Sequence, residues 1–328
     1  MISHNISTRT IVKFFLIPLI GYVVWENRDV LFALLIGFIL MSALRPAVNY
    51  LHHKKRIKRH ISAAVVYVGF ITFLSVVLGT IVPPIITETM IFIQKLPETL
   101  SSLPPNILKL IRLEEITQYI PNFTKDLVFI VGSIFSNTML VITTLVFGFY
   151  LLAQDKISSP LIDGYVSAHT QNHFRRFMVR LEEGLSSWFW GELVLMLAVG
   201  SLSYIGFLVI GLRYALPLAV LAGLLEAIPT FGPTIAAIPA VLIGFSISPI
   251  VGFAALAWGF VVQQLENNLL VPYIMKRAVG ISPIVTMLSI FIGLRLAGPL
   301  GVLLAVPTYV CIYALLAYRL EHKNSPTT

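Results

Sequence analysis

The stretch LAGLLEAIPTFGPTIAAIPAVL, Leu221 to Leu242, decides how the C-terminal half of the chain folds. It lies in an apolar run of 33 residues, 215–247, which is too long for one straight membrane span and too short for two complete spans joined by a turn. Pro229 removes a backbone donor and disfavours helix at the residues before it, and Gly232 and Pro233 follow closely. We therefore predict two short helical arms with an interruption between them, as a re-entrant hairpin or a pair of half-helices.

The interruption carries an acid, Glu226, which a simple membrane anchor would not contain. Non-helical backbone is tolerated at membrane depth only where protein buries it or where it lines a water-filled cavity. A charged side chain at the bilayer centre costs roughly 2.5 to 3.5 kcal/mol on insertion scales, so Glu226 needs a partner or water. We expect a water-filled cavity at the break, with Glu226, Pro229, Gly232 and Pro233 as candidate binding residues.

The composition of the whole chain places it in a membrane. Hydrophobic residues make up 57% of the 328 residues and charged residues 12%, and the mean hydropathy is +0.88, which leaves too little polar surface for a water-soluble protein. The apolar runs are continuous rather than alternating, which predicts helices and not barrel strands. We predict an all-α polytopic integral membrane protein of the cytoplasmic (inner) membrane, with about eight hydrophobic segments that include one or two broken hairpins.

The apolar segments and the polar intervals between them divide the chain into five parts. The third span is expected to run from Ile61 to Val82, because Pro83 and Pro84 follow it. The parts are N-terminal membrane segments with a basic loop (1–82), an extracytoplasmic helical region (83–125), a fourth span with an amphipathic helix (126–190), a C-terminal transport core (191–320) and a polar tail (321–328).

The basic loop, residues 45–60, carries six Lys or Arg residues and no acid. The positive-inside rule makes this loop cytoplasmic, and counting spans from it places both termini in the cytoplasm. Its histidines lack the Cys or carboxylate partners of a metal site, and the excess charge needs no nucleic acid to explain it. We expect anionic lipid headgroups to bind its basic side chains, Arg45, Lys54, Lys55, Arg56, Lys58 and Arg59.

Residues 174–190 have a helical period, with Phe, Met, Leu and Trp on one face and Arg and Glu on the other. This pattern predicts a helix lying on the inner leaflet, followed by a fifth span from Gly191 to Leu212. The alternative is that its apolar face binds a protein partner.

A second set of polar residues follows the apolar stretch 249–265. It consists of Gln264, Glu266, Asn267 and Asn268, with Gln263 beside them, just before Pro272. Arg295 lies further on, near a second interruption at Gly298 and Pro299, which predicts another broken hairpin. We expect Glu226 or Glu266 to pair with Arg295, although each acid has a purely structural alternative as an interfacial or salt-bridged residue.

Several functional classes lack their sequence signatures. The chain has no Gly-Lys dipeptide, so it has no P-loop, and no HExxH, GxSxG or GxGD motif of a membrane protease or hydrolase. We expect no enzyme activity, cofactor or metal. A secondary transporter, a channel or a structural membrane protein remain, and a broken helix with an acid favours the first.

Two blocks of the sequence resemble the autoinducer-2 exporter (PerM-like) family of membrane permeases. The first is Gly211 to Leu242, with its IPxxGP core, and the second is Gln264 to Pro307, with QLENNLLVP, two glycines and a closing AVP. The N-terminal half matches the family only in layout. One departure is Trp190-Gly191-Glu192, where the family is expected to have Gln after Gly, so that this chain carries an extra acid at the mouth of the fifth span.

The resemblance implies a permease that exports the quorum-sensing furanone autoinducer-2 or exchanges sodium for protons, and it suggests a homo-oligomer, a pentamer. The residues themselves favour a secondary exporter of a small polar solute, coupled to an ion through Glu226. The alternatives are a monovalent cation/proton antiporter that uses the same acids and a non-transporting membrane scaffold.

Overall fold

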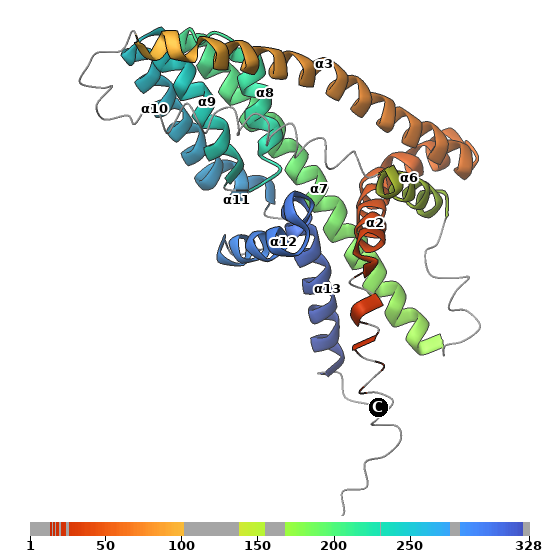
Figure 1. Cartoon of the computed structure of the whole chain (residues 1–328). Coiled ribbons are helices and arrows are strands. Elements are labelled where there is room, and N and C mark those ends of the chain that lie inside the picture. The colour runs from red at the N-terminus through yellow and green to blue at the C-terminus, as the bar shows by residue number, and fades with distance from the viewer. Residues whose placement is uncertain are drawn as a thin grey trace, which may run out of the picture.

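The structure, a computed structural model, describes residues 26–101, 138–154, 168–229, 231–275 and 283–323, and a few positions between 14 and 23 (Figure 1). Its regular elements are all helices: α2 (Arg28–Asn49), η1 (Tyr50–Lys54), α3 (Arg59–Ser101), α6 (Thr138–Ala153), α7 (Ala168–Ile210), α8 (Ala215–Leu225), α9 (Phe231–Ile247), α10 (Pro249–Leu265), η2 (Glu266–Leu270), α11 (Val271–Ile274), α12 (Pro283–Leu303) and α13 (Ala305–Lys323). The predicted all-α class is confirmed. Residues 102–125 of the predicted extracytoplasmic region lie outside the described residues.

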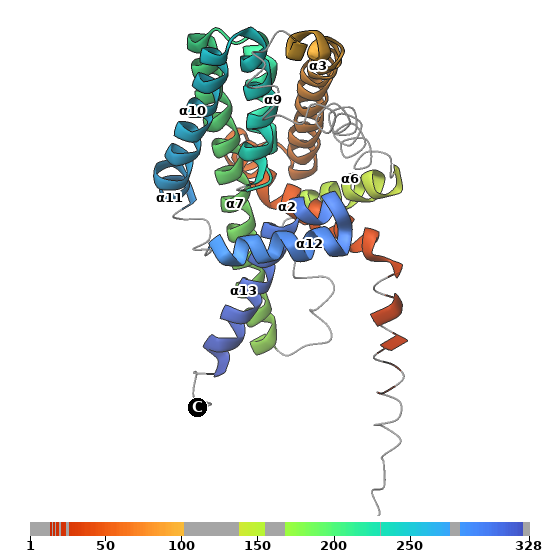
Figure 2. The ribbon, with the colours of Figure 1, turned by 60° about the vertical axis from the view of Figure 1, so that its left-hand side comes forward.

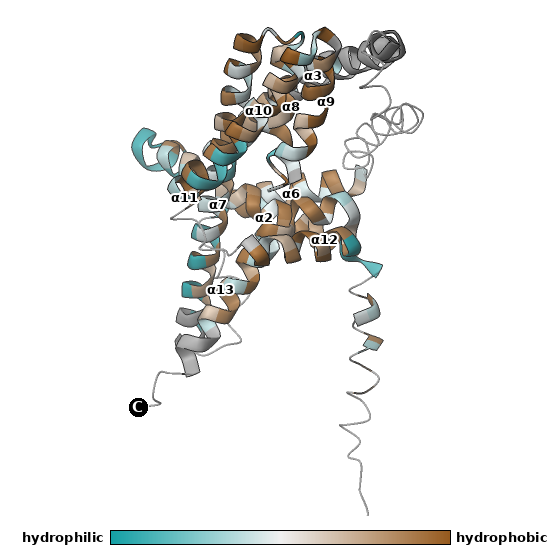
Figure 3. Ribbon diagram, turned by 90° about the vertical axis from the view of Figure 1, so that its left-hand side faces the viewer, coloured by the Kyte–Doolittle hydropathy of each residue, from teal (hydrophilic) through white to brown (hydrophobic). Residues whose placement is uncertain are grey.

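Several helices present apolar side chains outward, as expected of a protein in lipid. Val209 on α7 and Ile250 on α10 are more than 80% exposed, and apolar residues dominate α8, α9, α10 and α12 (Figure 3). Among the described residues, five helical segments are long and apolar enough to cross a bilayer, and four shorter apolar helices accompany them. The chain is therefore a multi-pass membrane protein.

The N-terminal helices α2, α3 and α6 pack together around Met41, Val48 and Leu152, which are fully buried. α2 and α6 cross closely, because a Cβ on Gly37 would lie 3.1 Å from the backbone nitrogen of Gly148. α3 continues as a helix through Pro83 and Pro84 to Ser101, beyond the predicted end of the third span, while its apolar membrane-length segment is Arg59–Val77. A proline in a membrane helix is tolerated when neighbouring groups satisfy the freed carbonyls.

The basic loop is also more helical than expected, because α2 and η1 carry helix as far as Lys54. Two of its six cationic side chains are internal. Arg45 forms a salt bridge with Glu182 of α7, and Arg59 is buried and donates to the Asn49 side chain and the Leu152 carbonyl. These two arginines therefore join helices, whereas Lys54, Lys55, Arg56 and Lys58 are exposed.

α7 is one helix of 43 residues, so the predicted separation between an amphipathic helix and a fifth span is wrong. Its apolar N-terminal face does not lie on lipid: Leu181 and Leu185 pack with Ile39 of α2 and Val310 of α13. The sequence pattern identified the face correctly, but protein covers it. α7 thus links the N-terminal group of helices to α8, α9 and α10 (Figures 1 and 2).

Helices α7 to α10 form the unit that holds the candidate site. At one end Phe207, Leu218, Ala240 and Ala255, one from each helix, belong to a single buried apolar cluster. The turn from α9 to α10 is tight, because the Ser248 hydroxyl accepts from the Val251 amide (3.3 Å) and Pro249 starts α10. The helix break of α8 and α9 lies at the opposite end of this unit.

The second predicted interruption is confirmed. α12 is kinked at Ala297 and Gly298, and Gly298 has a φ of +59°, which glycine adopts without a Cβ penalty. Its two arms fold back on each other so closely that a Cβ on Gly293 would lie 2.2 Å from the Gly301 carbonyl oxygen. α12 is therefore a helical hairpin, and α13 follows it after Leu304 (Figure 2).

Candidate functional site: a buried carboxyl cluster at the helix break

The break between α8 and α9 consists of a short turn that begins at Glu226. α8 ends at Leu225 and α9 begins at Phe231, as the positions of Pro229 and Pro233 predicted. The Ile228 amide donates to the Leu225 carbonyl (2.9 Å), and the Gly232 amide donates to the Ile228 carbonyl (2.8 Å). The turn thus satisfies part of the backbone that the prolines interrupt.

Gly232 is the tightest point of the turn. A Cβ at this position would lie 1.7 Å from the Leu225 carbonyl oxygen, so only glycine lets the start of α9 approach the end of α8. Pro229 and Pro233 are half-buried on either side of it. These three residues shape the turn that carries Glu226.

Close helix packing brings α8 onto α7 and positions two acids. A Cβ on Gly223 would lie 2.6 Å from the Met196 carbonyl oxygen, so the two helices touch at their backbones. One turn further along each helix lie Glu192 of α7 and Glu226 at the end of α8. Both are buried, at 6% and 2% exposure.

α10 supplies the third acid. Trp258 Nε1 donates to the Leu202 carbonyl (3.1 Å), which fixes α10 against α7. α10 then passes into the π-helical turn η2, a local form of helix that is frequent at functional sites, whose first residue is Glu266. Glu266 is 2% exposed, and Gln263 Nε2 donates to its Oε2 (3.4 Å).

The three carboxyl groups form one electrostatic cluster. The side chains of Glu226 and Glu266 share a hydrogen bond, and Glu192 interacts electrostatically with both. A hydrogen bond between two carboxyl groups requires a proton on one of them. Among the described residues, no Lys or Arg acts on any of the three, so the cluster has no internal countercharge.

Two carboxyl oxygens of the cluster also lack a hydrogen-bond partner. They are Glu192 Oε1 and Glu226 Oε2, and both are inaccessible to solvent in this conformation. Burying a polar atom without a partner costs about 1–3 kcal/mol, and more if it is charged. The cluster is therefore built at a cost to stability, which is typical of a functional site.

The expected pairing with Arg295 is not formed. Arg295 is exposed on α12, and within the described part of the chain it forms no ion pair with Glu226 or Glu266. Gln264, Asn267 and Asn268 are exposed too, and Asn268 Nδ2 bonds the Gln264 side chain (2.8 Å). Helical geometry explains this result, because neighbours of an inward Glu266 must point outward.

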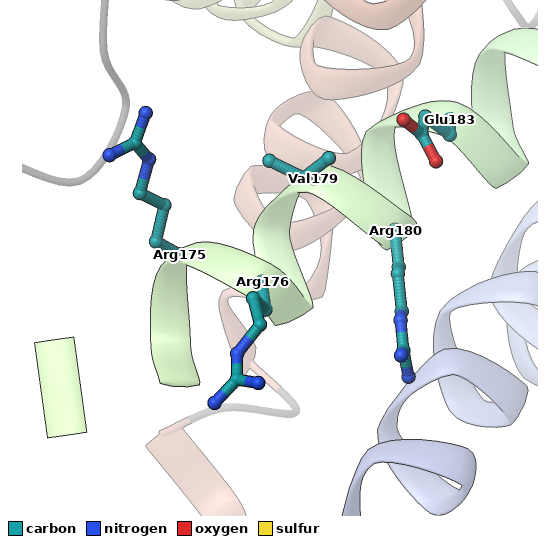
Figure 4. Close-up of a pocket in the computed structure, with 5 residues that line it drawn as sticks. All are labelled: Arg175, Arg176, Val179, Arg180 and Glu183. Carbon is teal, nitrogen blue, oxygen red and sulfur yellow. The ribbon is translucent and has the colours of Figure 1, made fainter. Parts of the chain in front are cut away.

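The expected water-filled cavity at the break is not open in this conformation. Glu226 is buried, and the Gly232 backbone packs directly on Leu225. A separate hollow lies along the N-terminal part of α7, where Arg175, Arg176, Val179, Arg180 and Glu183 line it (Figure 4). The arginines in Figure 4 point in different directions, so they do not converge on one ligand.

The two interrupted helices meet at the site. Ile228, in the turn between α8 and α9, packs against a buried cluster of Ile290 and Val302 from α12 and Ala305 from α13. The carboxyl cluster therefore has the α12 hairpin beside it, and a movement of that hairpin would act on the turn directly.

Sequence reasoning missed Glu192 as a member of the site. Its only signal was an acid after Gly191, in the segment Trp190-Gly191-Glu192. Gly191 lies against Met275, since a Cβ there would approach the Met275 sulfur to 2.9 Å, and this packing brings α7 close to η2 and α11. Such proximity depends on tertiary contacts that no local pattern reveals.

Comparison with known proteins gives a consistent result over nearly the whole chain. A sequence model of the family described as "AI-2E family transporter" matches residues 14–320. YueF of Bacillus subtilis is 27% identical in an alignment of 331 residues that covers 94% of this chain and 88% of that protein. YrrI of the same organism is 26% identical over 333 residues, covering 96% and 94%. Both carry the name "Putative transport protein".

Proposed function

Because the chain belongs to the AI-2E transporter family, we propose that it is a secondary active exporter of a small polar solute such as autoinducer-2, coupled to protons through Glu226 and Glu266. The observation that carries this proposal is the shared hydrogen bond of two buried carboxyl groups at an interrupted membrane helix. Interrupted helices near the middle of the membrane form the ion and substrate sites of many secondary transporters.

Electrostatics determines which conformation of the site binds protons. A buried carboxylate without a counterion costs several kcal/mol, so the closed arrangement requires protons on the cluster. Loss of those protons charges the cluster and favours a hydrated, open arrangement. If the site opens to one side of the membrane at a time, the proton gradient then drives the exchange.

The mobile element in this proposal is the α12 hairpin. Ile228 joins the turn at Glu226 to Ile290 and Val302, and α12 is only weakly buried in the rest of the protein. Separation of these contacts would expose the carboxyl cluster without unfolding α7 or α10. Pro229, Gly232 and Pro233 would then line the entrance.

A monovalent cation/proton antiporter is the second candidate, because the cluster is acidic and lacks a described basic partner. In this case a sodium ion takes the place of the exported solute. The four exposed cationic residues of the basic loop, Lys54, Lys55, Arg56 and Lys58, are proposed to bind anionic lipid in either case.

Flux measurements in proteoliposomes test the proposal. A pH step across the membrane should drive movement of autoinducer-2, and Glu226→Gln and Glu266→Gln should each lower the initial rate at least tenfold. Glu183→Gln is the matched control, because Glu183 is an exposed acid on α7. Sodium flux without autoinducer-2 movement selects the antiporter, and full flux in both cluster variants rejects the assignment of the site.

A further inference from the structure

Glu192 is an acid that the proposed mechanism does not yet use. It is a residue of α7, whereas Glu226 lies at the α8–α9 turn and Glu266 begins η2, so three separate elements converge on the cluster. Its Oε1 atom is buried and has no hydrogen-bond partner. The shared proton of the Glu226–Glu266 pair therefore does not account for Glu192.

We propose that Glu192 is a second proton-binding group of this site, so that the three carboxyl groups together carry two protons in the closed form. The proposal rests on the proton-coupled function above and extends it to a third residue and a second proton. Glu192 would act as a proton acceptor in its own right, beside the pair.

The charges around Glu192 support this proposal. One shared proton leaves the Glu226–Glu266 pair with one negative charge, and an ionised Glu192 would add a second. Across the helices packed on α7, the described titratable groups that act on the cluster are these carboxyls alone, with no Lys, Arg or His among them. Leaving two negative charges buried together costs several kcal/mol, which a second proton removes.

A bound metal ion is the other way to neutralise the cluster, and the sodium test below distinguishes it from a second proton. Within the described part of the chain, no three His, Cys, Asp or Glu side chains are arranged to hold a metal ion. A proton needs no such arrangement, because a single carboxyl oxygen binds it. The buried, unpartnered Oε1 atom of Glu192 is such an oxygen.

Infrared spectroscopy of the reconstituted full chain measures these protons directly, with neither solute nor gradient. The carbonyl band of protonated carboxylic acids, followed from neutral to alkaline pH, should lose about half of its pH-dependent area in Glu192→Gln. The triple variant Glu192→Gln, Glu226→Gln and Glu266→Gln should lose all of it. Glu183→Gln should leave the band unchanged, and Glu192→Asp should retain its full area at a shifted frequency.

Each other outcome overturns the proposal. An unchanged band in a folded Glu192→Gln protein means that Glu192 carries no proton, and complete loss means that it only supports the pair. Replacement of potassium by sodium at fixed pH should leave the carboxylic-acid band of the unmodified protein intact. Loss of that band in sodium would mean that a metal cation, and not a proton, occupies the site. Because no transport is measured, a failure here is distinct from a failure of the flux experiment.

Discussion

At the scale of single residues, the sequence predicted the positions of some side chains of the site correctly and of others not. The place of Glu226 at a helix break was predicted from two prolines and a glycine, because these residues interrupt a helix through their own local backbone geometry. The burial of Glu192 was not predicted, since it depends on the contact of Gly223 with α7 about thirty residues away. Arg295 was predicted to pair, yet it is exposed, because pairing depends on helix rotation.

Gly232 provides a test at this scale. Gly232→Ala forces a Cβ into the Leu225 carbonyl, so we expect a loss of about 1–3 kcal/mol in the free energy of unfolding. Thermal unfolding in detergent measures it. Gly69→Ala on α3 is the control, because a Cβ there meets no atom within 4 Å and the expected change is within about 1 kcal/mol. Equal stability of the two variants would contradict the packing described for the turn.

At the scale of elements, the sequence predicted helix interruptions correctly where glycine stands next to proline, and wrongly where proline or a change of polarity occurs without such a glycine. α12 turns at Gly298, which has a positive φ, whereas α3 continues through Pro83 and Pro84. α7 remains continuous although its polarity changes near Trp190, because polarity sets what surrounds a helix and not where it ends.

Spin labels test the continuity of α7. Labels at the exposed positions Glu183 and Leu197 are fourteen residues apart, which corresponds to about 21 Å along an α-helix. Pulsed electron paramagnetic resonance should give one narrow distance distribution near this value. A broad or bimodal distribution would indicate a break between an amphipathic helix and a fifth span.

A crosslink tests the proposed movement of the α12 hairpin. Ile228→Cys and Ile290→Cys in a Cys311→Ala background, joined by a short disulfide-forming bifunctional reagent, should hold the turn and the hairpin together. We expect at least tenfold slower flux, because the carboxyl cluster stays closed, and recovery after reduction. Each single-cysteine variant treated in the same way is the control, and undiminished flux in the crosslinked protein would exclude this opening.

At the scale of the whole molecule, composition alone predicted the class, since the continuous apolar runs admit only membrane helices. What composition did not predict is the arrangement: α7 spans the protein and joins the α2, α3 and α6 group to the α8–α10 unit (Figure 1). The acids converge because that arrangement brings α7, α8 and α10 to a common point. No local pattern contains this information.

The orientation in the membrane remains a prediction and is measurable. Lys55→Cys in a Cys311→Ala background places a thiol on the exposed basic loop, which the positive-inside rule makes cytoplasmic. A membrane-impermeant maleimide should label it in inside-out vesicles and leave it unlabelled in right-side-out vesicles. The reverse labelling would invert the topology and place both termini outside.

In the proposed function, protonated carboxyl groups at the helix break carry out the coupling. Dicyclohexylcarbodiimide, which reacts with protonated carboxyls in apolar surroundings, tests it in the unmodified chain. Mass spectrometry should find Glu226, Glu266 or Glu192 modified, with flux falling in proportion to that modification and both effects weakening as the pH rises. Flux that persists when these residues are modified, or absence of modification under conditions that support transport, would contradict the account.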